Sequence, residues 1–259
     1  MMAGARRWLG YALLGLLVYL FFSIATLPAS ALSWALTRFG PGTFTLEQPQ
    51  GTIWSGSGVL RLNLPAIAPT VRWQVLPSRL LRGALGLLVE ARHERTHLAA
   101  ELRRDWRGWS AHDLIATLPA ESVPAFAPAA RLLAPLGKIE IASDTLRIGA
   151  SAVNGTVNII WSDAGTEMMG LQGLGQYRIA LEGRGKEIAI HASTESGDLE
   201  INANGIWQVI GDGTLALQGH AVARGRQKEL EPLLQMIGPT RPDGAHAFAV
   251  RTQLPALPH

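Results

Sequence analysis

Residues 177–191 read YRIALEGRGKEIAIH, and this stretch decides the fold class. Apolar and polar residues alternate in both halves, 177–182 and 187–191, on either side of the segment Gly183-Arg184-Gly185-Lys186. Alternation with a period of two places successive side chains on opposite faces of a strand. Glycine supplies the backbone freedom that a tight turn requires. The stretch therefore predicts a β-hairpin.

The same pattern continues after Pro41, where glycine interrupts short apolar or alternating runs at intervals of roughly ten residues. Further strands are expected at residues 51–64, 71–76, 137–148, 153–161, 198–202, 205–209 and 214–219. Short strands with turn signals between them are typical of an all-β protein. We therefore expect a mainly β fold, with an antiparallel, curved sheet that forms two lobes.

A few short helices are expected beside the strands, at residues 32–39, 111–118 and 227–237. The last of these has the spacing of one apolar helical face, which is formed by Leu230, Leu233, Leu234 and Ile237. Gly238 and Pro239 then provide a stop signal. The Pro-rich run 119–135 is interpreted as a connector between a β-rich N-terminal lobe, 46–118, and a β-rich C-terminal lobe, 136–259.

The N-terminal region contains an apolar run, Trp8 to Leu27, without one formal charge. About twenty such residues suffice for a helix to cross a hydrocarbon core of ~30 Å. Arg6 and Arg7 precede the run, and basic flanks tend to remain in the cytoplasm. The sequence therefore predicts a single-pass inner-membrane protein with the bulk of the chain in the periplasm. Its parts are a cytoplasmic N-terminus, 1–7, a transmembrane helix, 8–27, and a juxtamembrane segment, 28–45.

A cleaved signal peptide is the alternative interpretation of this region. Ala29-Ser30-Ala31 has the small-x-small form of a cleavage site. The apolar run is, however, longer than the ~7–15 residues of a typical signal peptide core. The sequence therefore favours a retained anchor.

Composition argues against thiol chemistry and against nucleic-acid binding. The chain has no cysteine, so neither a disulfide framework nor thiol redox chemistry is available. Its formal net charge is only +3 and its basic residues are scattered, so we expect no nucleic-acid partner.

One motif indicates zinc chemistry: His93-Glu94-Arg95-Thr96-His97 has the pattern H-E-x-x-H. In zinc peptidases the two histidines lie on one helical face and bind the metal, while the glutamate acts as the general base. No third ligand at a suitable spacing follows, and Arg92 and Arg95 would place cations beside the metal. We therefore interpret His93, Glu94 and His97 as a coincidence in a polar turn between two strands, and assign no metal, cofactor or catalytic residue. A membrane-anchored zinc peptidase stays as an alternative.

A second motif is Gly51-Thr52-Ile53-Trp54-Ser55-Gly56-Ser57-Gly58. Gly56 and Gly58 permit the positive φ of a tight turn or bulge, so a turn is expected at Ser55 to Gly58. A similar glycine–apolar–Trp strand ends at Trp161. Two roles are open for these residues: buried tryptophans that cap the β-core, or contact with a partner. The candidates for a turn or partner contact are Gly51, Trp54, Ser55, Gly56, Ser57, Gly58 and Trp161.

The order of these features resembles a known family. The chain has a basic N-terminus, one apolar span, the segment Glu47 to Gly58, Trp73 with Leu76-Pro77, and a late Leu-Leu-x-x-Ile-Gly before Asp243-Gly244. In this it is similar to the N component of the type II secretion system over nearly its whole length. The resemblance implies an accessory inner-membrane component of the apparatus that exports folded proteins across the outer membrane. It implies no enzymatic activity, no cofactor and no catalytic residues.

The resemblance also implies the partners, namely other components of the secretion apparatus, with inner-membrane lipid contacted by the anchor. A different function is an envelope protein that handles lipids or other hydrophobes with a curved sheet, as AsmA-like proteins do. A continuous apolar face on the strands would favour this alternative. A polar face with exposed tryptophan would favour docking to proteins.

Overall fold

The computed structural model describes residues 2–39, 44–62, 68–80, 82–126, 130–131, 134–242 and 244–254 of the 259. Asp243 of the Asp243-Gly244 pair lies outside these residues, as do parts of the Pro-rich connector and of the juxtamembrane segment. The chain forms two compact units, Met1–Leu76 and Pro77–His259.

The first unit contains two helices and three strands. They are α1 (Met2–Ala25), α2 (Ala29–Phe39), β1 (Phe44–Gly51), β2 (Ser55–Leu62) and β3 (Thr70–Val75). β2 pairs with β1 and with β3, in both cases antiparallel. The Ser33 hydroxyl of α2 donates a hydrogen bond to the Leu46 carbonyl of β1 at 2.7 Å. The helix predicted at 32–39 is thus confirmed, with an earlier start.

The structure does not confirm the membrane span predicted at residues 8–27. α1 is helical over most of this range. In the part of the chain that the structure describes, however, no helix has both the length and the apolar character for a membrane crossing. The transmembrane helix therefore stays a prediction from sequence.

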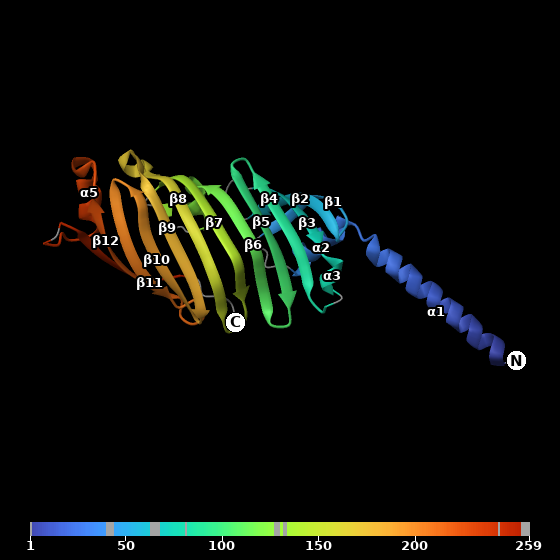
Figure 1. The fold of residues 1–259 in the computed structure, drawn as a ribbon. Coiled ribbons are helices and arrows are strands. Elements are labelled where there is room, and N and C mark those ends of the chain that lie inside the picture. The colour runs from blue at the N-terminus through green and yellow to red at the C-terminus, as the bar shows by residue number, and fades with distance from the viewer. Residues whose placement is uncertain are drawn as a thin grey trace. The chain divides into compact units, whose positions relative to one another are not determined.

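The second unit is dominated by an antiparallel sheet, in which each strand pairs with the next in sequence (Figure 1). Its strands are β4 (Leu85–His93), β5 (Thr96–Asp105), β6 (Gly108–Pro119), β7 (Pro135–Ile148), β8 (Val153–Thr166), β9 (Leu171–Gly185), β10 (Glu187–Gly197), β11 (Leu199–Trp207), β12 (Thr214–Ala223) and β13 (His246–Gln253). Its helical segments are α3 (Pro77–Leu80), η1 (Ala120–Ser122), α4 (Val123–Phe126), η3 (Glu167–Met169) and α5 (Gln227–Ile237). The prediction of a mainly β, antiparallel fold with few helices is confirmed.

The hairpin predicted at 177–191 is present as β9 and β10. Leu181 lies opposite Ile190, and Arg184 lies opposite Glu187 next to the turn. The helix predicted at 227–237 coincides with α5. Its residues Leu230, Leu233 and Leu234 are buried, as the helical spacing predicted.

The helix predicted at 111–118 is wrong, because these residues belong to β6. Asp113 has a positive φ of 49°, and the pairing of β5 with β6 is irregular at this point. A bulge of this kind adds one residue to a strand and shifts the alternation. Apolar residues on either side of the bulge then fall at the spacing of a helix: Ala111, Leu114, Ile115 and Leu118.

The Pro-rich segment 119–135 joins two neighbouring strands of the same compact unit. β6 ends at Pro119, β7 begins at Pro135, and the two strands pair directly, with Leu118 opposite Ile139. The boundary between the two compact units follows Leu76. The predicted lobes, 46–118 and 136–259, are instead separated by residues 119–135.

Candidate functional site

The strand register separates the side chains of the second unit onto two chemically different faces. One face, called the apolar face below, carries mostly aliphatic and aromatic side chains on the strands from β4 to β13. Its members include Leu87, Val89, Leu98, Leu102, Leu114, Ala116, Leu118, Ile139, Ile141, Val157, Ile159, Trp161, Tyr177, Ile179, Leu181, Ile188, Ile190, Leu199, Ile201, Leu217, Ala221, Phe248 and Val250.

Bulges keep the apolar residues in phase along the strands. Asp113 in β6 and Asp163 in β8 have positive φ angles of 49° and 51°, and the register shifts beside each of them. Aspartate tolerates this conformation better than most residues, because its short side chain can bond locally. Each shift corrects a break in the alternation, so that the apolar face continues across the bulge.

Two clusters cover the apolar face in part. In one, Leu230, Leu233 and Leu234 of α5 pack against Leu171, Leu174, Leu199 and Ala221. In the other, Val209 and Ile210 pack beside Val153. Ile141, Ile159 and Ile190, which belong to neither cluster, are only half-buried. A sheet face under a complete second layer would bury them, so the described part of the chain leaves the apolar face accessible to a ligand or partner at these positions.

A cavity of about 390 Å³ lies between α5 and the apolar face. The helix contributes Leu233, Met236 and Ile237 to its wall. The sheet contributes side chains of five strands, among them Trp161, Tyr177, Leu199, Ile201, Ala221, Phe248 and Val250. None of the described residues that line the cavity carries a charge. Pockets of this size are typical of small-ligand sites.

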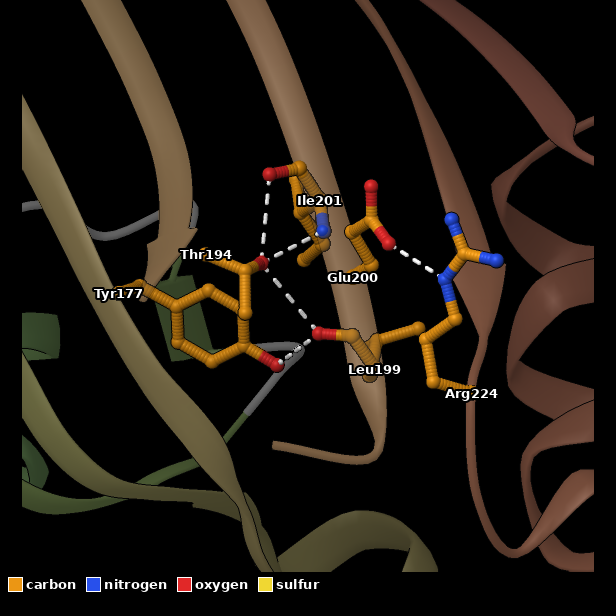
Figure 2. Close-up of polar contacts among 6 residues, drawn as sticks. All are labelled: Tyr177, Thr194, Leu199, Glu200, Ile201 and Arg224. Atoms are coloured by element: carbon orange, nitrogen blue, oxygen red, sulfur yellow. Dashed lines mark hydrogen bonds and ion pairs between the residues drawn. The ribbon is translucent and has the colours of Figure 1, made fainter. Parts of the chain in front are cut away.

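The polar atoms near this cavity are bonded within the protein (Figure 2). The Tyr177 hydroxyl donates a hydrogen bond to the Leu199 carbonyl at 2.9 Å. The Thr194 hydroxyl accepts a bond from the Ile201 amide at 2.7 Å and lies 3.2 Å from the Ile201 carbonyl. The Trp161 indole N–H donates to the Leu136 carbonyl at 2.9 Å. Burial raises the pKa of Tyr177 to about 12, so the phenol stays a donor.

The opposite face of the sheet is charged and solvated. Ion pairs form between side chains two residues apart or on adjacent strands, including Lys138–Glu140, Glu182–Arg184, Arg178–Glu195 and Glu200–Arg224. A hydrogen bond from Arg184 lowers the pKa of the Glu182 carboxyl. Exposed pairs of this kind add little stability, but they keep this face in water. The sheet is therefore amphipathic.

The zinc-like motif lies in the β4–β5 hairpin. His93 ends β4 opposite Thr96, the first residue of β5, and Glu94 occupies the turn with a φ of 45°. His97 lies opposite Arg92, so the register directs His93 and His97 to opposite faces. His97 Nε2 is 3.2 Å from Glu90 Oε1, and hydrogen bonds from His97 and Arg92 lower the pKa of Glu90.

This geometry differs from the helical one that zinc peptidases use. Two histidines on opposite faces of a hairpin cannot bind one metal ion together. Among the described residues, no group of three or more His, Cys, Asp or Glu side chains is arranged to hold a metal.

The glycine–serine motif is arranged differently from its prediction. The turn lies at Thr52 to Trp54, and Ser55 to Gly58 begin β2. The prediction of a turn at 55–58 is therefore wrong by three residues. Gly51, with φ of 87°, ends β1 opposite Gly56. The Trp54 indole N–H donates to the Ile24 carbonyl of α1 at 2.8 Å.

Gly56 and Gly58 make room for neighbouring side chains. A Cβ atom on Gly56 would lie 2.5 Å from Cζ2 of Trp73, and one on Gly58 would lie 2.8 Å from Cδ1 of Leu46. Trp73 and Leu46 are both buried. The motif thus allows the strands to pack closely around Trp73, a role that the turn prediction did not include.

Trp106, in the β5–β6 turn, is 84% exposed, more than any other aromatic side chain among the described residues. The guanidinium of Arg107 lies over its ring, 4.6 Å from the centroid. Arg104 similarly lies 5.4 Å from the ring of Trp109, which is 46% exposed. We call these four residues the hairpin tip. The sequence signal for it was WRGW between two alternating runs.

The fold and these surfaces define an antiparallel β-sheet protein with one charged face and one apolar face that is only partly covered. A family model described as "Type II secretion system (T2SS), protein N" matches residues 43–251. The chain belongs to this family, which confirms the resemblance seen in the sequence, and it is a component of type II secretion. Comparison with curated proteins and with solved structures found no significant match.

Proposed function

We propose that this chain is an accessory inner-membrane component of the type II secretion apparatus. The apolar run Trp8 to Leu27 anchors it, and the β-rich part acts in the periplasm by contacts with other components. The family match over residues 43–251 supports the process. The uncharged length of the N-terminal run supports the anchor.

The proposed role in protein contacts rests on the exposed side chains of the hairpin tip. Trp106 is 84% exposed, and Arg107 stacks on it. Tryptophan and arginine dominate the binding energy of protein interfaces, because they combine large apolar area with directed polar groups. By contrast, Trp54 and Trp161 are half-buried and bonded to backbone carbonyls within the chain. The docking site is therefore the hairpin tip, and its partner is another secretion component with an acidic and apolar surface.

Crosslinking in cells tests this function. A photoreactive amino acid replaces Trp106 in the full chain, expressed at its native level, and captured proteins are identified by mass spectrometry. We expect capture of a secretion component. The matched control carries the same amino acid at Glu94, which lies in the exposed turn between β4 and β5. Equal capture at both positions, or none at Trp106, would contradict the docking role.

The part of the apolar face that the two clusters leave accessible supports a second function, the handling of lipids or other hydrophobes. Alternation of charged and apolar faces is expected when one face meets water and the other an apolar layer. Large uncovered apolar surfaces mark binding sites in soluble domains. An apolar ligand bound to this face would complete the second layer.

A further inference from the structure

We propose that the cavity beneath α5 binds a hydrocarbon chain of a membrane phospholipid. The proposal rests on the second function, hydrophobe handling, and makes it specific to one site and one ligand class. It is independent of the docking role of the hairpin tip.

The chemistry of the wall selects a hydrocarbon. Leu233 and Ile237 present aliphatic groups from the helix, and Phe248 presents an aromatic ring from the sheet. The donors of Trp161 and Tyr177 are already bonded to backbone carbonyls at 2.9 Å. A peptide segment would bring amide groups that need partners in the cavity. An alkyl chain needs none, so it is the ligand that this wall accepts at least cost.

The size of the cavity fits part of a long chain. A volume of about 390 Å³ holds roughly a dozen groups the size of a water molecule or a methylene, at about 30 Å³ each. The apolar face continues beyond the cavity through half-buried side chains such as Ile159 and Ile190. At about 4.8 Å between neighbouring strands, β4 to β13 extend over roughly 40 Å. A lipid chain can therefore end in the cavity and lie along the sheet.

The sources of such chains are phospholipids and free fatty acids. We commit to the phospholipid, because the proposed anchor, Trp8 to Leu27, holds the protein beside a bilayer. Acyl chains of membrane lipids are then the hydrocarbon that it meets at the highest local concentration.

The test uses the full chain reconstituted in vesicles of phosphatidylethanolamine and phosphatidylglycerol. A fraction of the lipid carries a photoreactive diazirine near the end of one acyl chain. After irradiation, labelled peptides are mapped by mass spectrometry. We expect label on α5 and on the strand segments around Tyr177 and Leu199, in addition to the anchor. Label confined to the anchor would overturn the proposal.

Two pairs of variants separate the cavity from general membrane contact. Met236→Trp narrows the cavity from an exposed position, whereas Gln235→Trp adds the same ring to the neighbouring exposed position. Val250→Glu puts a charge in the cavity wall, and Ala249→Glu puts it on the other face of the edge strand. We expect cavity labelling to be lost in the first member of each pair and to be retained in the second. Thermal unfolding should be unchanged in all four variants. Equal labelling within both pairs would refute the site.

Two further outcomes identify another occupant. Labelling by a photoreactive free fatty acid, without labelling by the phospholipid probe, would overturn the phospholipid assignment. Capture of a protein from a photoreactive amino acid at Met236 in cells, with no lipid label, would replace the lipid by a protein segment. Capture at Trp106 is a separate result, so the failure of one proposal does not conceal the fate of the other.

Discussion

Tyr177 belongs to β9 and lines the cavity, and its ionisation gives a direct test of its environment. Burial raises its pKa from 10 to about 12. Below pH 10 both folded and unfolded states hold the phenol proton. Between pH 10 and about 12 the unfolded state loses it first, so the free energy of unfolding falls as pH rises. We expect this fall to be smaller in Tyr177→Phe, measured by urea unfolding at about pH 9 and about pH 11.

The same substitution has a separate effect near neutral pH. Tyr177→Phe removes the hydrogen bond to the Leu199 carbonyl, and the Thr194 hydroxyl remains 3.4 Å from that carbonyl. The expected loss of stability is therefore about 1 kcal/mol. Identical pH profiles for wild type and variant would show that the phenol is solvated in the folded state.

Gly56 gives a second prediction at the scale of the residue. In Gly56→Ala the new methyl would lie 2.5 Å from both the Gln50 carbonyl oxygen and the Trp73 ring. Such overpacking costs ~1–3 kcal/mol, because backbone or a buried ring must move. We expect a lower urea midpoint by circular dichroism.

Two neighbouring positions serve as controls for Gly56→Ala. Gly58→Ala should cost less, since its nearest neighbour is the flexible end of Leu46 at 2.8 Å. Ser57→Ala adds no atoms and should leave stability nearly unchanged. An equal loss in all three variants would show that the strand, and not the space around Trp73, determines the effect.

At the scale of the element, the β4–β5 hairpin explains why the zinc-like motif is not a helix. Its turn residue Glu94 has φ of 45°, a conformation that costs non-glycine residues about 1–2 kcal/mol. We expect Glu94→Gly to raise stability by up to about 1 kcal/mol in thermal unfolding, because glycine adopts this conformation without strain.

Metal analysis of the full chain provides the complementary check on this hairpin. A zinc peptidase would lose stoichiometric metal in His93→Ala and all activity in Glu94→Gly. We expect no difference in zinc content between wild type and His93→Ala, because His93 and His97 project to opposite faces. Zinc that is bound by wild type and lost in the variant would overturn this interpretation.

Sequence patterns predicted elements well where alternation was unbroken. Lys138 to Ile141 and Tyr177 to Glu182 alternate cleanly, and both lie in strands. The pattern failed around Asp113, where a bulge turned strand spacing into helix spacing. It also failed at Ser55 to Gly58. The glycines there predicted a turn, but in the structure they allow close packing within β2. Both failures arise from contacts between strands, which a single strand's sequence does not contain.

At the scale of the whole molecule, the candidate site was only partly predictable. The sequence left the handling of hydrophobes as an alternative that a continuous apolar face would favour, but it did not predict that such a face exists. Whether apolar residues of successive strands line up depends on register, because a slip of one residue moves a strand's apolar set to the other face. The cavity depends further on where α5 packs. The amphipathic spacing of residues 227–237 was the signal for a covering helix, but not for its place on the sheet.

The amphipathic sheet leads to a prediction about the protein's role in cells. Ile141→Glu places a charge on the apolar face where Ile141 is half-buried, whereas Ala142→Glu places it on the charged face of the same strand. Burial of an unpaired carboxylate under an apolar ligand is costly, so Ile141→Glu should block whatever binds this face. Both variants are introduced into a strain that lacks the gene, and the levels and assembly of other secretion components are measured.

We expect Ala142→Glu to restore these levels and Ile141→Glu to fail, although both chains accumulate equally. The comparison isolates the face, because position, strand and added charge are nearly the same. If Ile141→Glu restores assembly as fully as Ala142→Glu does, the apolar face has no part in the function, and the hairpin tip alone must account for it. If Trp106→Ala fails as well, both surfaces are needed, as expected when one binds lipid and the other a protein.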